Sequence, residues 1–159
     1  MNFTTKIPIT QNANPIDYNS KIVSFGSCFA ENMGDKLCYY KFQTQVNPFG
    51  IIFNPFSIEK LIERVVIQHH FTKDDIFLFN ERWHCYEVHS ELSDADAEVV
   101  LSKLNRILSD TQKQLQQATH IIITYGTSWV YRHIETNAIV ANCHKVPQKQ
   151  FKKELLSVE

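Results

Sequence analysis

The sequence of 159 residues lacks the features that mark membrane, secreted and nucleic-acid-binding proteins. No stretch approaches the roughly 18 consecutive apolar residues of a membrane-spanning helix. The first ten residues contain Lys6 but no apolar core of a signal peptide. Sixteen basic against seventeen acidic residues give a formal net charge of -1, which leaves no basic excess for nucleic acid or an anionic membrane. We therefore expect a cytoplasmic protein with neither nucleic acid nor membrane among its partners.

Cysteine and glycine are both scarce, with four residues of each. The cysteines are far apart in the sequence, and without an export signal we expect free thiols rather than disulfides. Cys85 with His89, and Cys143 with His144, lack the CxxC spacing of a structural zinc site, so no metal and no other cofactor is expected. Three glycines, Gly26, Gly50 and Gly126, stand where apolar runs break, as turns require.

The remaining composition is that of an ordinary globular domain, with 43% hydrophobic and 12% aromatic residues. Residues 1–20 are polar and Asn-rich and end near Asn14-Pro15, which predicts an N-terminal arm. Residues 21–159 then form a single domain.

Strands and helices are predicted to alternate along this domain. Helices are expected at 30–40, at 58–68 with Ser57 as its cap, from a capping box of Ser93 and Asp96 to about Gln117, and from Gln148 onward. Strands are expected at 21–25, 76–79, 83–88 and 119–125, followed by a small hairpin of 129–132 and 138–141. The continuous apolar run at 119–125 is typical of a parallel strand covered on both faces.

This alternation predicts an α/β domain with three layers, α/β/α, around a parallel sheet. Only two central strands are evident, so the sheet is expected to be incomplete at its C-terminal side. We expect its later strands to come from beyond Glu159 or from another chain, which makes a homo-oligomer through the incomplete sheet one expectation.

Ligands of open α/β sheets bind at the carboxyl ends of the strands. Four segments could supply a site there: Gly26-Ser27-Cys28, Asn47 to Gly50, Gly126 to Trp129, and Asn142 to His144. A thiol at a helix N-terminus can be a nucleophile, and so can an activated serine. Structural roles compete with these: Ser27 as a helix cap, Cys28 as a small buried residue, and Trp129 as strand packing.

Four motifs in order resemble the GSCFA family: Gly26-Ser27-Cys28-Phe29-Ala30, then 47–55, 125–131 and 142–147. That family resembles a branch of the SGNH/GDSL hydrolases. The resemblance implies a flavodoxin-like three-layer α/β fold and a reaction with acyl esters.

The resemblance also implies roles for individual residues. Cys28 falls at the position of the nucleophile, Ser27 at that of the preceding aspartate, and Gly50 at that of an oxyanion donor. Ser128 stands where the superfamily has an oxyanion Asn, which weakens the case for esterase activity. The general base, a His, is expected beyond Glu159, and His144 is the substitute within this sequence.

Two functions follow as expectations. The first is an SGNH-like acyl-ester hydrolase or acyltransferase with Cys28 or Ser27 as nucleophile, Gly50 and Ser128 at the oxyanion site, and a small acylated substrate. Its substrate contacts would come from Asn47, Gly126, Trp129, Asn142 and His144. The second is a non-catalytic module that binds a small molecule or carbohydrate in the same pocket. A fragment without independent function is a third reading.

Overall fold

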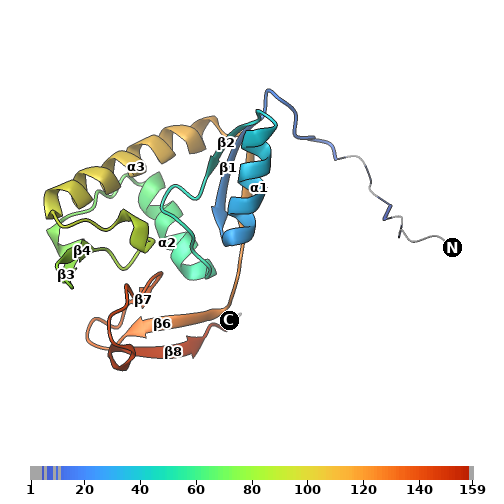
Figure 1. The fold of residues 1–159 in the computed structure, drawn as a ribbon. Coiled ribbons are helices and arrows are strands. Elements are labelled where there is room, and N and C mark those ends of the chain that lie inside the picture. The colour runs from blue at the N-terminus through green and yellow to red at the C-terminus, as the bar shows by residue number, and fades with distance from the viewer. Residues whose placement is uncertain (1–4, 6, 9, 11, 158–159) are drawn as a thin grey trace.

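The computed structural model describes residues 12–157 together with residues 5, 7, 8 and 10. Part of the expected arm therefore lies outside the described residues, and residues 12–20 contain no helix or strand. The helices are α1 (Cys28–Tyr39), α2 (Pro55–Val66) and α3 (Ala97–Gln117). The strands are β1 (Lys21–Gly26), β2 (Gln43–Val46), β3 (Phe77–Phe79), β4 (Arg82–His84), β5 (His120–Thr124), β6 (Trp129–His133), β7 (Ile139–Val140) and β8 (Phe151–Leu155). Figure 1 shows their arrangement.

A parallel sheet with the order β2-β1-β5 forms the centre of the protein. Strand β1 pairs with β2 from Lys21 opposite Gln43, and with β5 from Ile22 opposite His120. The parallel sheet and the mixed α/β class are as predicted. Strand β2 was not predicted, because three of its four residues are polar and its place in the sheet depends on backbone pairing with β1.

Helices lie on both sides of this sheet (Figure 1). Val23 and Phe25 of β1 pack into one hydrophobic core with apolar residues of α2 and α3. On the other face, Gly34 of α1 lies directly against Val46 of β2, where a Cβ would come within 2.1 Å of the valine side chain. This glycine allows α1 to approach the sheet closely.

Two predicted helix caps are wrong. Helix α2 is capped by Asn54, whose Oδ1 accepts the Ser57 N–H at 2.8 Å, and Pro55 opens the helix with a fixed φ and no N–H to lose. Helix α3 is capped by Asp96 and not by Ser93. The Ser93 hydroxyl instead lies 2.7 Å from Nδ1 of His84. In both cases the capping side chain is an amide or carboxylate three residues away from the expected position.

The prediction that both faces of β5 are covered is wrong, because alternate residues of the strand are exposed. Strand β5 also lies at one edge of the sheet. Ile121 is 55% exposed and Ile123 is 39% exposed. The strand covered on both faces is β1, in which only Lys21 is exposed. Ile123 and Tyr125 line a shallow groove of about 370 Å³ beside α2. The apolar run indicates that this face of β5 can be covered, but among the described residues Ile121 and Ile123 stay exposed.

The C-terminal part of the chain forms a small antiparallel sheet, β7-β6-β8, below the carboxyl ends of β1 and β5 in Figure 1. The predicted hairpin of β6 and β7 is confirmed, with Tyr131 opposite Val140. The predicted helix from Gln148 is wrong, because a 3₁₀ turn at Gln148–Gln150 leads into β8. Phe151 is buried there by β6 pairing, not by a helical face.

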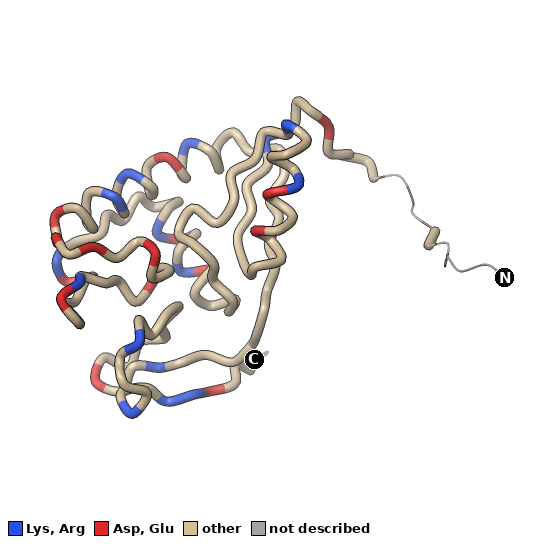
Figure 2. Tube along the Cα trace, viewed as in Figure 1, with Lys and Arg blue, Asp and Glu red and all other residues tan. Residues whose placement is uncertain are grey.

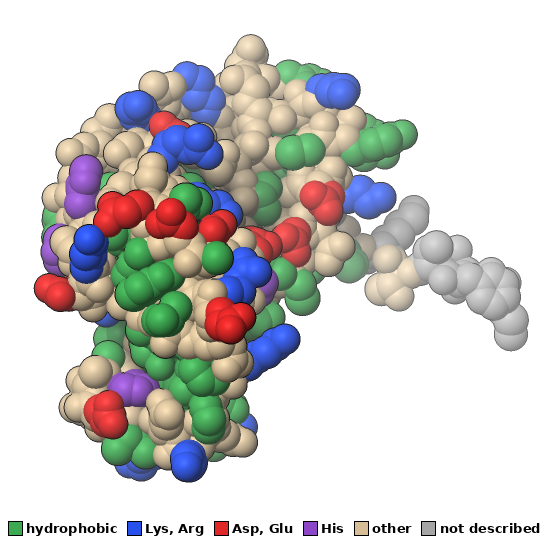
Figure 3. All heavy atoms as spheres, turned by 60° about the vertical axis from the view of Figure 1, so that its left-hand side comes forward, with side chains coloured by type: hydrophobic (Ala, Val, Ile, Leu, Met, Phe, Trp, Pro, Cys, Tyr) green, Lys and Arg blue, Asp and Glu red, His purple; other side chains and the backbone are tan. Residues whose placement is uncertain are grey.

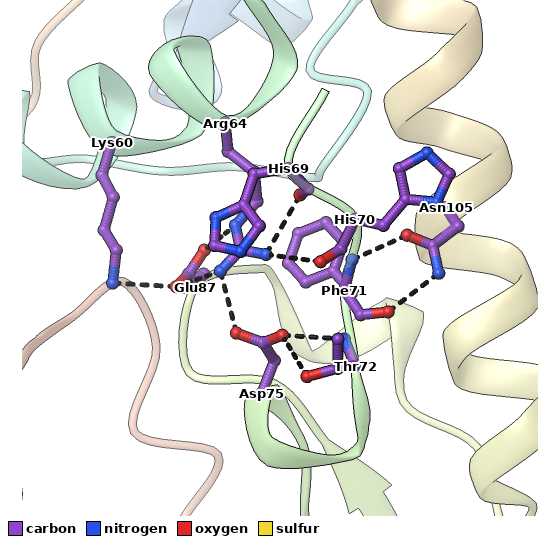
Figure 4. Close-up of polar contacts among 9 residues, drawn as sticks. All are labelled: Lys60, Arg64, His69, His70, Phe71, Thr72, Asp75, Glu87 and Asn105. Atoms are coloured by element: carbon purple, nitrogen blue, oxygen red, sulfur yellow. Dashed lines mark hydrogen bonds and ion pairs between the residues drawn. The ribbon is translucent and has the colours of Figure 1, made fainter. Parts of the chain in front are cut away.

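Arg64 of α2 anchors the segment between α2 and α3, as Figure 4 shows. Its guanidinium is only 6% exposed and lies 2.8 Å from Asp75 and 2.9 Å from Glu87, which also pairs with Lys60. It also donates to the backbone carbonyls of His69 and His70. Burial acts to raise the pKa of Asp75, but the Thr72 N–H and the Arg64 charge bring it below its ordinary value. One buried cation thus orders two carboxylates and a loop.

Charges of both signs are distributed over the whole chain (Figure 2). On the side of the β3–β4 hairpin, acidic side chains gather in a row near the start of α3 (Figure 3). No helix in the part of the chain that the structure describes is long and apolar enough to cross a membrane.

Candidate functional site

The turn after β1 is held from two sides. The Gly26 N–H donates to Oδ1 of Asn47 at 2.8 Å, and the Gly26 carbonyl accepts the Ile52 N–H at 3.0 Å. Gly26 has a φ of +139°, and a Cβ there would lie 2.1 Å from the carbonyl oxygen of Thr124. Only glycine fits this turn, because both the left-handed backbone and the close approach of β5 exclude a side chain.

Ser27 caps α1 and also ties it to β5. Its Oγ accepts the Phe29 N–H at 3.3 Å and lies 3.1 Å from Oγ1 of Thr124. Its N–H donates to the Thr124 carbonyl at 3.0 Å. Ser27 is 7% exposed, so its hydroxyl is engaged within the protein. These contacts favour the structural alternative for Ser27. Thr124 was missed because it ends an apolar run as an ordinary strand residue.

Cys28 is the first residue of α1, and it is exposed. It stands where the helix dipole places partial positive charge and where N–H groups of the first turn lack partners within the helix. The alternative that Cys28 is a small buried residue is therefore wrong. The exposed position leaves its thiol accessible to an incoming reactant.

The segment from Asn47 to Gly50 forms a tight turn against the same strand end. The Asn47 N–H donates to the Ser24 carbonyl at 2.9 Å, and the Gly50 N–H donates to the Asn47 carbonyl at 2.8 Å. Gly50 has a φ of +78°, and a Cβ there would lie 2.3 Å from Cβ of His89. The predicted oxyanion donor is thus close to the turn after β1, but its N–H is engaged in this conformation.

Gly126 brings the third segment to the same place. The N–H groups of Gly126 and Thr127 both donate to the Phe53 carbonyl, at 2.8 and 3.2 Å. A Cβ at Gly126 would lie 2.6 Å from the Phe53 ring. Ser128 follows on the surface, and its carbonyl accepts the Leu156 N–H at 2.9 Å.

Trp129 is the first residue of β6 and is 48% exposed. The Lys153 Nζ lies 4.8 Å from the centre of its ring, and Leu155 is its partner in the sheet. These contacts are those of strand packing with a cation over an aromatic face.

The hydrogen bonds of Gly26, Asn47 and Gly126 bring three of the four predicted segments together at the carboxyl end of the parallel sheet.

The fourth segment, from Asn142 to His144, makes its contacts elsewhere. Nε2 of His144 lies 2.7 Å from the Cys85 carbonyl, and its ring lies 4.8 Å from that of His84. His144 is 4% exposed. Burial, together with the nearby His84 and His89, lowers the pKa of His144 from 6.5 to about 4. None of its hydrogen bonds reaches the turn at Cys28, so the structure does not support His144 as the substitute base.

The buried Cys85 thiol is not a candidate nucleophile. Cys85 is buried, and burial raises the pKa of its thiol to about 12, so this cysteine is inert at neutral pH. In the described part of the chain, no group of three or more His, Cys, Asp or Glu residues is arranged to hold a metal ion.

The sequence is similar to a known protein family. Neither the curated proteins nor the solved structures contain a match to this sequence. One protein-family model does match, that of the GSCFA family, and it covers residues 21–159. The match begins at the first residue of β1 and includes all four predicted segments. The chain therefore belongs to the GSCFA family.

Proposed function

We propose that the protein is an SGNH-like acyl-ester hydrolase or acyltransferase in which Cys28 is the nucleophile. The observation that carries the proposal is the exposed Cys28 thiol on the first residue of α1, above a turn held by Asn47 and Thr124. A fixed strand–turn–helix junction keeps such a thiol in one position, at the positive end of the helix dipole. The proposal extends to the full three-layer fold of that superfamily and to a location in the cytoplasm.

In this reaction the Cys28 thiolate attacks the acyl carbon of the substrate and forms a thioester. The C–O or C–S bond to the leaving group breaks, and the leaving group takes up a proton. Water, or the hydroxyl of an acceptor, then attacks the thioester and regenerates the thiol. The Gly50 N–H can contribute to oxyanion stabilisation only if its bond to the Asn47 carbonyl opens.

Turnover of p-nitrophenyl acetate and of a short acyl-CoA by the complete protein tests this proposal. We expect Cys28→Ala to reduce turnover to the uncatalysed rate, and mass spectrometry to show an acyl group on Cys28 in the wild type. Cys38→Ala is the matched control, because Cys38 is an exposed thiol on the same helix. Equal turnover by the wild type and Cys28→Ala would contradict the proposal.

A non-catalytic module that binds a small molecule is the second candidate. The engaged Gly50 N–H, the buried His144 and the Ser27 hydroxyl committed to capping favour it. This candidate predicts that iodoacetamide labels Cys28 no faster than Cys38. Labelling of Cys28 that is at least about tenfold faster would favour the catalytic candidate, because the thiolate is the reactive form.

The open edge of β5 supports a separate proposal about assembly, in which a second copy of this chain pairs along that edge. Ile121 and Ile123 are exposed beside it, and an edge strand offers unpaired N–H and C=O groups. Sedimentation over a range of concentrations tests the pairing. Ile123→Lys is expected to abolish it, whereas Leu78→Lys on the β3–β4 hairpin is the control. A wild-type monomer at every concentration would overturn the proposal.

A further inference from the structure

A separate cavity of about 660 Å³ lies between the β3–β4 hairpin, residues 89–91 at the start of the 3₁₀ turn Ser90–Leu92, and the turn at residues 142–145. Its wall contains two cationic side chains, Arg82 and Lys145, and three imidazoles, those of His84, His89 and His144. Glu91 is its one carboxylate. This charge balance differs from that of the chain as a whole, which carries a formal charge of -1.

The one carboxylate of the cavity lies at its edge. Oε2 of Glu91 is 3.7 Å from Nδ1 of His89. Its Oε1 is among the atoms nearest to Gly50, 2.8 Å from where a Cβ would lie. Glu91 thus lies against the wall that the cavity shares with the Asn47–Gly50 turn. Among the described residues, neither Arg82 nor Lys145 forms an ion pair within the cavity.

The turn at the cavity rim has a left-handed backbone at two consecutive residues. His144 and Lys145 are consecutive residues with φ values of 47° and 61°. Such left-handed conformations cost about 1 kcal/mol or more for residues other than glycine or asparagine. The turn is held by the His144 N–H on Oδ1 of Asn142 and by the Val146 N–H on the Cys143 carbonyl.

The imidazoles in the cavity are held in fixed orientations. Nε2 of His84 faces the Phe79 carbonyl at 3.1 Å, and Nε2 of His144 faces the Cys85 carbonyl at 2.7 Å. A carbonyl only accepts, so both Nε2 atoms carry the proton. Nδ1 of His84 is then free to accept from Ser93.

From the cavity and its two cationic side chains, which face a single carboxylate at the edge, we propose that this cavity binds the oxyanion group of a small molecule, a phosphate or a carboxylate. Arg82 and Lys145 supply positive charge, and Asn142 forms part of the cavity wall. The site is independent of the chemistry at Cys28. It shares a wall with the Asn47–Gly50 turn through His89, so its ligand lies next to the proposed reaction site.

Titration of the complete protein with inorganic phosphate and, separately, with acetate tests this site at pH 7 and constant ionic strength. Imidazole resonances from histidine-labelled protein report the binding. We expect saturable shifts of the His84 and His144 signals with at least one of the two anions. A bound anion also favours protonated imidazole, so the pKa of His144 is expected to rise above its value in the free protein.

Lys145→Gln and Arg82→Gln are each expected to weaken binding about tenfold, since each removes one charge-assisted contact. Lys149→Gln is the matched control, because Lys149 is an exposed cation outside the cavity. Saturation by phosphate alone identifies a phosphorylated ligand, and saturation by acetate alone identifies a carboxylate. The absence of saturable shifts with either anion overturns the proposal, as does equal weakening by Lys149→Gln. None of these results depends on ester turnover, so they stand apart from the test of Cys28.

Discussion

The hydroxyl groups of Ser27 and Thr124 lie 3.1 Å apart and join two residues that are 97 positions apart in the sequence. Ser27 caps α1 and Thr124 ends β5, so the contact connects the helix that carries Cys28 to the edge of the sheet. Thr124 also receives the Ser27 N–H, both on its carbonyl and on its hydroxyl. The position of Cys28 is therefore determined by a strand that follows it late in the chain.

Replacement of Thr124 by valine tests this connection. The change keeps the shape of the side chain but removes the hydroxyl that pairs with the Ser27 hydroxyl and shares the Ser27 N–H with the Thr124 carbonyl. We expect the free energy of unfolding to fall by about 1–2 kcal/mol, the cost of leaving a buried polar group with poorer pairing. Urea denaturation measures the change.

Thr111→Val is the matched control for that experiment. Thr111 is 1% exposed, and its hydroxyl has no hydrogen-bond partner among the described residues. The same chemical change is therefore expected to leave stability unchanged or to raise it. A similar loss in both variants would mean that the Ser27–Thr124 contact contributes nothing specific.

Arg64→Ala is expected to be the most damaging single change in the ion-pair network of Figure 4. It leaves Asp75 and Glu87, which are 20% and 13% exposed, without their shared cation. Removal of one partner from a buried pair typically costs about 3–5 kcal/mol, and here Lys60 still pairs with Glu87, so about 3 kcal/mol is expected. Thermal or urea unfolding measures it. Lys73→Ala breaks the exposed pair with Glu98 and is expected to leave the stability nearly unchanged. Comparable losses in the two variants would contradict the role given to Arg64.

Much of the fold around Cys28 could be predicted from the sequence, because local signals determine it. The break at Gly26 after an apolar run predicted the strand–turn–helix junction, and periodic apolar residues predicted α2 and α3. The long apolar run of β5 likewise predicted a strand. In each case the residues that fix the element lie within a few positions of one another.

The elements that were missed depend on contacts between distant residues. Strand β2 is mostly polar and exists because β1 offers it a backbone partner. Residues 151–155 have an apolar spacing that suits a helix, but pairing of Phe151 with His133 of β6 makes them a strand. The cavity of His84, His89 and His144 could not be predicted either, because its three segments meet only in the folded chain.

The four cysteines are expected to react with a thiol reagent in distinct groups. Cys28 and Cys38 are exposed and should react in the native protein at neutral pH. Cys143 is half-buried, and burial raises the pKa of its thiol, so it should react slowly. Cys85, with a pKa of about 12, should react only after unfolding. Reaction of Cys85 as fast as that of Cys38 in the native protein would contradict its burial.

Cys85 also makes stability depend on alkaline pH. Its pKa is raised on folding from 9.0 to about 12, so the unfolded chain releases this proton at lower pH than the folded protein does. The contribution is fully present below pH 9 and is lost as the pH rises toward 12. We expect Cys85→Ala, although less stable at pH 7, to lose less stability between pH 9 and pH 11 than the wild type. Urea midpoints at these two pH values measure the difference; parallel losses would contradict the prediction.

His144 makes stability depend on acid pH, with stability falling as the pH falls. Its pKa is lowered on folding from 6.5 to about 4, first because it is buried and then because His84 and His89 lie nearby. Between these values the unfolded chain binds a proton that the folded protein does not, so stability present above pH 6.5 is lost as the pH falls toward 4. The full loss amounts to about 3 kcal/mol. We expect His144→Gln, which keeps a donor for the Cys85 carbonyl, to flatten the stability profile between pH 6.5 and pH 4. If His144→Gln follows the wild-type slope, His144 is not the group that titrates.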